Sequence, residues 1–226
     1  MDEEEELKVK VAKACRILHH EGLADFLGHV SARIPETDKI LIKPRATSLE
    51  SVTPKDILTV HLDGRKLDGR SSPPGELLLH TSIYRVRSDV GSVVHVHPPI
   101  AIAFTITGKE ILPVCNKGAV FAEGIPVFDS SLLIRTNELG KMVADKLGKH
   151  YALLLRGHGA VTVGRSVEEA CVRAIYLEET AKIQLLASII GTPRPLIDEE
   201  IKDAPREREF PSAWSYYESR IPWAEG

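Results

Sequence analysis

The stretch SVVHVHPP, residues 92–99, predicts a buried strand that stops at two prolines. Its valines are β-branched, and a short apolar run of such residues favours a strand. His95 and His97 stand two residues apart in this run. Because side chains alternate across a strand, both imidazoles project from the same face, about 6 to 7 Å apart. Two imidazoles placed in this way can converge on one metal ion.

A second stretch, YALLLRGHGAVTV at residues 151–163, predicts two buried strands joined by Gly157-His158-Gly159. The flanking glycines permit backbone angles that other residues resist. His158 is therefore at a strand end and is our candidate for the third ligand. Three protein ligands with one open position are typical of a catalytic zinc site. The alternative for each histidine alone is a hydrogen-bonded core residue.

The remaining pattern indicates a single α/β domain in which strands and helices alternate without strict repetition. Pro73 and Pro74 predict a helix start that places Glu76 in the first turn, and Ser166 with Glu169 forms a capping box. We expect helices at residues 7–20, 76–87, 137–147 and 166–190, a short helix after Pro99, and strands at 40–42, 57–61, 92–97, 125–128, 151–156 and 160–163.

The C-terminal segment differs in composition, because it is rich in proline and polar residues and carries both tryptophans, Trp214 and Trp223. We interpret residues 1–190 as the catalytic domain and 191–226 as an irregular tail. Aromatic side chains on such a tail usually dock on a surface. The tail is expected to pack on the same domain or on a neighbouring subunit.

Composition excludes several classes of partner. A formal charge of −3 with basic residues spread along the chain gives no positive field for nucleic acid. The acidic run at residues 2–6 is unlike a signal peptide, and no uncharged run approaches the roughly 20 residues that span a bilayer. Cys15, Cys115 and Cys171 lie far apart among apolar neighbours, which predicts reduced thiols and a cytoplasmic protein.

Four motifs resemble the class II aldolase/adducin family, in order and over most of the chain: GHVSAR at 28–33, PGE at 74–76, HVHP at 95–98 and RGHG at 156–159. The resemblance implies a three-layer α/β/α sandwich around a mainly antiparallel sheet. It further implies a homotetramer with active sites at subunit interfaces. The tail aromatics could then cover a neighbour's site, although packing on their own subunit is an equal alternative.

Carried onto this sequence, the family pattern makes His95, His97 and His158 the ligands of a divalent ion, Zn²⁺ or Mn²⁺. It makes Glu76 the acid/base, since proton removal beside a metal-polarised oxygen needs a nearby carboxylate. From the residue alone, Glu76 could equally be a solvated acid at a helix N-terminus.

The loops around the motifs distinguish two branches of the family. Aldolases related to L-fuculose-1-phosphate aldolase usually carry Gly-Asn-Val-Ser, a Thr-Gly turn in the next loop, and paired serines directly before the glutamate. Here His29 replaces the asparagine and KPRA at 43–46 replaces the turn. PPG at 73–75 separates the serines from Glu76. The chain therefore looks more like the branch that decarboxylates hydroxylated pyridine or benzene dicarboxylates.

Cationic and polar side chains near the motifs are candidates for substrate binding, because guanidinium groups match carboxylates bidentately. His29 is expected to donate to a developing oxyanion or to protonate carbon, with a packed loop histidine as the alternative. His80, four residues after Glu76, is expected to pack or orient rather than ligate. The substrate-binding candidates are Ser31, Arg33, Lys43, Arg45 and Arg156.

Together these features predict a metal-dependent carbon-carbon lyase that stabilises an enolate or enediolate. The expected reaction is decarboxylation of a hydroxylated aromatic acid or of a hydroxy or keto acid. Aldol cleavage of a sugar phosphate is the alternative, and a non-catalytic adducin-like interaction module is a third.

Overall fold

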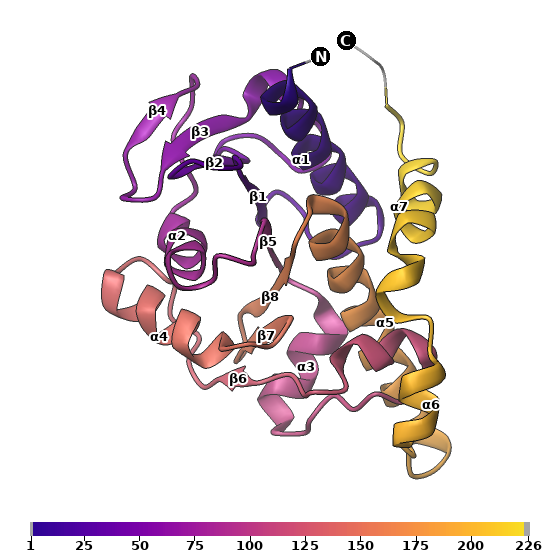
Figure 1. Cartoon of the computed structure of the whole chain (residues 1–226). Coiled ribbons are helices and arrows are strands. Elements are labelled where there is room, and N and C mark those ends of the chain that lie inside the picture. Colours follow the sequence, from indigo (N-terminus) through magenta and orange to yellow (C-terminus); the bar gives the residue numbers. More distant parts are fainter. Residues whose placement is uncertain (1, 224–226) are drawn as a thin grey trace.

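The computed structural model describes residues 2–223 and is built on one sheet of eight strands in the order β4-β3-β2-β1-β5-β8-β7-β6 (Figure 1). All neighbouring strands are antiparallel except β6 and β7, which are parallel. The strand bounds are β1 His29–Arg33, β2 Lys39–Ile42, β3 Leu58–His61, β4 Lys66–Asp68, β5 Ser92–Val96, β6 Val127–Phe128, β7 Ala152–Leu155 and β8 Gly159–Gly164.

Helices cover both faces of the sheet, which confirms the three-layer α/β/α arrangement (Figure 1). One face carries α1 (Glu3–His20), α3 (Pro99–Thr107) and α5 (Val167–Ile190). The other carries α2 (Leu77–Val86) and α4 (Asn137–Leu147). Each face has its own apolar core, because the alternation along each strand sends successive side chains to opposite layers.

The central strand β5 shows this division most directly. Val94 and Val96 belong to the core beneath α1 and α5, whereas Val93 belongs to the core beneath α2 and α4. His95 shares the face of Val93. On the neighbouring strand, His29 lies directly across from His95, and Ser31 across from Val93. The side chains of His29, Ser31 and His95 therefore face α2.

Strand β1 and the short strand β4 were not among the predicted elements. β1 has the sequence HVSAR, whose only large apolar residue is Val30, so it carries little of the signal by which buried strands are recognised. Its residues His29 and Ser31 are nevertheless buried. They are polar because this face of β1 belongs to a polar site rather than to the apolar core.

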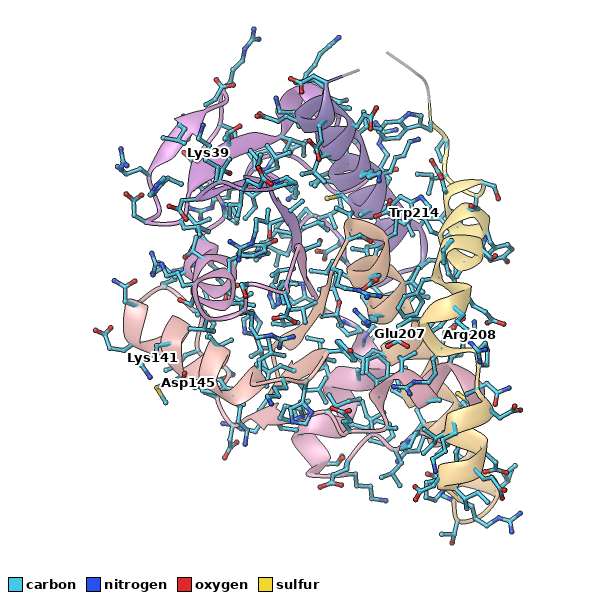
Figure 2. The ribbon with its side chains drawn as sticks, in the orientation of Figure 1. Lys39, Lys141, Asp145, Glu207, Arg208 and Trp214 are labelled. Atoms are coloured by element: carbon cyan, nitrogen blue, oxygen red, sulfur yellow. The ribbon has the colours of Figure 1, made fainter. Side chains whose placement is uncertain are left out.

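The tail is more regular than predicted. It contains α6 (Asp198–Asp203) and α7 (Phe210–Glu218), preceded by a short 3₁₀ helix, Arg206–Glu209. Phe210, Trp214 and Tyr217 recur at helical spacing and are buried in the same core as α1 and α5. Figure 2 shows Trp214 between α7 and α1. The expectation of an irregular tail was therefore wrong, because the flanking prolines masked a helical pattern.

Two further short 3₁₀ helices, Pro54–Asp56 and Asn116–Phe121, complete the regular structure between residues 2 and 223. Within that part of the chain, no helix is both long and apolar enough to span a membrane. Cys15 and Cys171 are buried and Cys115 is partly buried, and all three cysteines are free thiols.

Candidate active site

Three histidines predicted as metal ligands meet at one end of the central strands. His95 is in β5, paired with Val161 of β8. His97 lies just beyond β5, where its backbone N–H donates to the carbonyl of Leu23 at 2.9 Å. His158 lies in the turn directly before β8. The antiparallel hairpin thus returns the chain to the strand end at which His95 and His97 project.

The three imidazoles are close enough to share one ion. One nitrogen from each of His95, His97 and His158 lies within 4.8 Å of the other two. The ring centroids of His95 are 4.9 Å from those of His97 and 5.0 Å from those of His158. The structure therefore brings together all three predicted ligands.

The hydrogen bonding of these histidines fits a divalent metal. Nδ1 of His95 donates to the carbonyl oxygen of Ala160 at 3.0 Å, and since a carbonyl can only accept, Nε2 of His95 carries the lone pair. Within residues 2–223, Nε2 of His95 and Nδ1 of His158 are buried without a hydrogen-bond partner. An unpaired buried nitrogen is costly, and a cation bound at Nε2 of His95 would satisfy the first of these two.

Burial also keeps the candidate ligands in the form that binds metal. It lowers the pKa of His95 well below its ordinary value, and it lowers the pKa of His97 in the same direction. A neutral imidazole is the species that coordinates a metal, so these histidines need no deprotonation at neutral pH.

Gly159 provides the space in which the imidazoles meet. A Cβ atom at this position would lie 2.5 Å from the carbonyl oxygen of Val96, 3.0 Å from His97 and 3.1 Å from His95. The backbone of Gly159 is not in the left-handed region, which Gly157 occupies with φ of 63°. The second glycine of the RGHG motif is thus required for room, and the first for conformation.

Glu76 lies beside the histidines. It directly precedes α2, whereas the sequence placed it within the first turn of that helix. Its Oε1 accepts a hydrogen bond from the backbone N–H of Ile134 at 2.8 Å. Its Oε2 lies 3.7 Å from Nε2 of His95 and 3.5 Å from Nε2 of His158. One carboxylate oxygen is thus fixed by the backbone while the other faces the imidazoles.

Burial by itself would raise the pKa of Glu76, but the nearby imidazoles of His158 and His95 and the N–H of Ile134 outweigh it. Together they lower the pKa of Glu76 to about 2. The side chain is therefore a carboxylate at neutral pH, able to accept a proton from a bound hydroxyl group.

A cavity of about 370 Å³ opens beside Glu76, His97 and His158. Its wall also includes His29, so the predicted catalytic residues share one space with the metal-ligand candidates. Phe26, Leu27 and Leu133 give it apolar sides that suit a flat organic substrate.

Three cations line the same cavity, namely Lys43, Arg45 and Arg135. Lys43 is only 2% exposed, and its ammonium contacts one backbone oxygen, that of Phe26, at 3.4 Å. Burial lowers the pKa of Lys43. Between residues 2 and 223, no carboxylate forms an ion pair with any of the three cations. This wall is suited to an anionic ligand.

Arg135 was not among the candidates from the sequence. A Cβ atom at Gly75 would lie 3.5 Å from Nε of Arg135, so this guanidinium is next to the loop that carries Glu76. The residue stands in no motif, and its position depends on the contact between Ile134 and Glu76. No signal in the sequence distinguishes it from a surface arginine.

Arg33, Arg156 and Ser31 lie elsewhere. Arg33 ends β1, about 13 Å along the strand from His29, and donates to the carbonyls of Tyr84 and Val90. Arg156 pairs with Asp129 and lines a different cavity. Adjacency to a motif did not bring these arginines to the site: Arg33 stands at the opposite end of β1 from His29, and Arg156, although two residues before His158, pairs with Asp129 instead. Ser31 is fully buried behind His29.

The model of the class II aldolase and adducin N-terminal domain matches residues 9–185. The chain belongs to this family. The resemblance seen in the four motifs is confirmed, and the class II aldolase fold places His29, Glu76, His97 and His158 around one cavity, with His95 close behind them.

Two relatives represent the two branches of the class II aldolase family. The 3,4-dihydroxyphthalate decarboxylase of Arthrobacter keyseri is 36% identical over 210 residues, which cover 86% of this chain and 84% of that protein. The L-fuculose phosphate aldolase of Methanocaldococcus jannaschii is 29% identical over 187 residues, which cover 81% of this chain and 98% of that protein. Both relatives cleave carbon-carbon bonds, and the present class II aldolase family member is a lyase.

The solved structure of L-fuculose 1-phosphate aldolase from Glaciozyma antarctica superimposes with a TM-score of 0.85. The match covers 97% of this chain and 89% of that one at 24% sequence identity. It establishes that the class II aldolase fold extends through the C-terminal helices as well as through the domain that carries the motifs.

Proposed function

We propose that this lyase decarboxylates a hydroxylated aromatic dicarboxylate. The observation that carries the proposal is a group of three cations on the wall of the cavity that holds Glu76, Lys43, Arg45 and Arg135, none of which forms an ion pair within the described part of the chain. Two carboxylates on one ring would neutralise most of this charge. The identity to 3,4-dihydroxyphthalate decarboxylase, higher than that to the aldolase relative, supports the same choice.

His95, His97 and His158 would hold a divalent ion, which we propose to be Zn²⁺ or Mn²⁺. When bound, such an ion supplies Lewis-acid stabilisation of negative charge on a substrate oxygen, worth several kcal/mol. Imidazole ligands suit Zn²⁺, and the carboxylate of Glu76 beside them would also suit Mn²⁺.

The chain's own side chains would perform the remaining steps. The cations orient the two carboxylates, and Glu76 accepts the proton of a ring hydroxyl. Glu76 then passes this proton to the ring carbon that bears one of the carboxylates, which leaves a ring carbonyl beside a tetrahedral carbon. The bond between that carbon and its carboxylate breaks, carbon dioxide leaves, and the electron pair restores the aromatic ring and returns negative charge to the ring oxygen, which regains a proton from solvent. Overall, one proton is taken up for each carbon dioxide released.

Aldol cleavage of a sugar phosphate is the second candidate. A phosphate is also a dianion that arginine and lysine bind well, so the cationic wall fits it in charge. The similarity to L-fuculose phosphate aldolase favours it. Against it stand His29 in place of the family's asparagine and the altered loops at 43–46 and 73–75.

We also propose a homotetramer in the cytoplasm. The C-terminal half of α5 supports assembly, since Leu186, Ile189 and Ile190 are 54%, 74% and 89% exposed. Exposed apolar side chains that gather on one element mark interaction surfaces. The three free cysteines support a reducing compartment.

Product analysis tests the proposed reaction. The purified protein, supplied with Zn²⁺ or Mn²⁺, is incubated in turn with 3,4-dihydroxyphthalate and with L-fuculose 1-phosphate. We expect carbon dioxide from the first and no aldehyde from the second. Aldehyde release from the sugar phosphate, without carbon dioxide from the phthalate, would overturn the proposal in favour of the aldolase.

A further inference from the structure

Four buried polar side chains form a continuous hydrogen-bonded chain that begins at His29. Nδ1 of His29 lies 2.6 Å from Nε2 of His80. Nδ1 of His80 lies 2.7 Å from Oγ of Ser31, which lies 2.8 Å from the hydroxyl of Tyr84. His29, Ser31, His80 and Tyr84 are 7%, 0%, 0% and 2% exposed.

The two elements that carry this chain match in spacing. His80 and Tyr84 are four residues apart on α2, about 6 Å along the helix axis. His29 and Ser31 are two residues apart on β1, about 6.6 Å along the strand. Two side chains of one helix face therefore interleave with two of one strand face, and the chain is part of the packing between the layers.

The protons in this chain can run in two orders. In the first, Tyr84 donates to Ser31, Ser31 donates to His80, and His80 donates from Nε2 to Nδ1 of His29. Each of the three hydrogens then lies on a contact of 2.8 Å or less. Burial raises the pKa of Tyr84, so its hydroxyl keeps the proton that this order requires.

The opposite order leaves one donor poorly placed. If His29 donates to His80 and His80 to Ser31, the hydrogens of Ser31 and Tyr84 still need acceptors. Among residues 2–223 the Tyr84 hydroxyl has a single side-chain partner, Ser31. Ser31 must then donate to the carbonyl of Val93 across 3.5 Å, at the limit for a hydrogen bond. The first order is the better satisfied of the two.

We infer that His80, Ser31 and Tyr84 fix His29 as the tautomer with its proton on Nε2, so that His29 presents an N–H donor to the cavity. Nδ1 of His29 is occupied by His80, and the side chain lines the cavity, so Nε2 is its free nitrogen. An N–H group cannot ligate a metal. His29 is therefore a hydrogen-bond donor to the substrate, although one of its nitrogens lies within 4.8 Å of ligand atoms of Glu76 and His95.

The contrast with His95 shows how neighbours assign these roles. Nδ1 of His95 faces a carbonyl, which can only accept, and the lone pair is left on Nε2. Nδ1 of His29 faces Nε2 of His80, whose other nitrogen, Nδ1, accepts a hydrogen bond from the hydroxyl of Ser31. Nε2 of His80 therefore carries the proton and donates to His29. Two histidines directly opposite each other across β1 and β5 thus present a donor and a ligand atom.

The tautomer stands independently of the reaction, whereas its catalytic use rests on the proposed function. In decarboxylation, an N–H from His29 would stabilise the ring oxygen that gains negative charge as carbon dioxide leaves. His80, Ser31 and Tyr84 act through His29 and are positioning residues.

Nitrogen NMR tests the tautomer directly, without any substrate. Long-range ¹H–¹⁵N spectra of imidazole-labelled protein with Zn²⁺ added distinguish a protonated ring nitrogen from a bare one, and His29→Gln assigns the signals. We expect Nε2 of His29 to be protonated and Nδ1 bare. A bare or metal-bound Nε2 would overturn the inference, whatever the enzyme's activity.

Substitutions test the origin of the tautomer. Tyr84→Phe removes the terminal O–H and should give a mixture of His29 tautomers, whereas Tyr217→Phe, at another buried tyrosine far along the chain, should not. An unchanged His29 spectrum in Tyr84→Phe would contradict the proposed role of the hydrogen bonds that link His29, His80, Ser31 and Tyr84.

Kinetics separate positioning from structure. With the decarboxylation substrate, His80→Leu should lower kcat about 10-fold or more with KM within about 3-fold. His80→Gln, whose amide can still donate to Nδ1 of His29, should recover most of the loss. Equal kcat losses in the two variants would count against the inference.

Discussion

The backbone N–H of Ile134 donates to Oε1 of Glu76 at 2.8 Å, and this bond connects two loops that approach the cavity from different parts of the chain. Glu76 precedes α2, and Ile134 precedes α4. The bond holds the carboxylate with its other oxygen toward the histidines, and it places Arg135, the next residue, at the cavity wall. The proposed general base and the cation proposed to bind substrate are thus positioned together.

Glu76→Gln should retain the fold and lose the chemistry. The amide oxygen can still accept from Ile134, but the side chain can no longer take a proton. We expect kcat to fall by about 10²- to 10⁴-fold, the usual contribution of a general base. Asp145→Asn, on the exposed face of α4 that Figure 2 shows, serves as the control. A kcat within 10-fold of wild type would rule out Glu76 as the base.

His95→Ala should abolish stoichiometric metal binding. The substitution removes the central imidazole of the three, and with it a buried nitrogen that has no hydrogen-bond partner among residues 2–223. Elemental analysis after dialysis measures the bound ion, and His61→Ala, on β3 and away from the cavity, is the matched control. If His95→Ala kept one equivalent of metal, these histidines would not be the ligand set.

A chelator should remove activity from the wild type, and added Zn²⁺ or Mn²⁺ should restore it.

Arg135→Met should weaken binding of a dianionic substrate. A charge-assisted hydrogen bond contributes about 1.5–3 kcal/mol, so KM should rise about 10- to 100-fold. Arg156→Met provides the comparison, since Arg156 forms an exposed pair with Asp129 and should change KM little. The reverse pattern would support the assignment made from motif adjacency and contradict the structural placement.

Arg173→Met should destabilise the fold. Arg173 is 1% exposed, donates to the carbonyl of Val163 at 2.8 Å, and stacks on Tyr151 at 3.9 Å. It also pairs with Glu169 at 3.2 Å. Loss of a buried cation that leaves its partner behind costs about 3 kcal/mol. Urea unfolding measures the change. Arg165→Met, which removes an exposed cation from the same Glu169, should cost less than about 1 kcal/mol.

The same cluster predicts a pH dependence of stability. Burial alone would raise the pKa of Glu169, but the Arg165 backbone N–H and the guanidinium groups of Arg165 and Arg173 hold it below its ordinary value of 4.5. As the pH falls, Glu169 therefore becomes protonated at a higher pH in the unfolded chain than in the folded protein. The stabilisation is complete above about pH 4.5 and is lost as the pH falls through the folded-state pKa. Urea midpoints measured between pH 3 and 6 should rise with pH, less steeply in Arg173→Met.

The parts of the fold that follow from periodic patterns could be predicted from the sequence. Helix α4 begins and ends at the predicted residues, 137 and 147, and Ser166 caps α5 as expected. That His95 and His97 project from the same face follows from the two-residue period of a strand. Membership of the class II aldolase family and the three-layer sandwich were confirmed.

What could not be predicted depends on contacts between distant segments. Arg135 lies at the cavity because the loop before α4 reaches it. Arg33 lies away from the cavity because β1 runs from His29, at the cavity, to Arg33 at its far end. His29 and His80 are 51 positions apart and meet only because α2 lies over β1. The predicted roles of the individual site residues remain predictions until the variants are measured.

Gly159 has a consequence for building such a centre elsewhere. A designer who copied His95, His97 and His158 onto another antiparallel hairpin would reproduce the donors and still fail if the residue beside them carried even one methyl group, because that carbon would lie 2.5 Å from a backbone oxygen. The minimal transferable unit therefore has four positions, three histidines that provide the nitrogens and one glycine that leaves room for them.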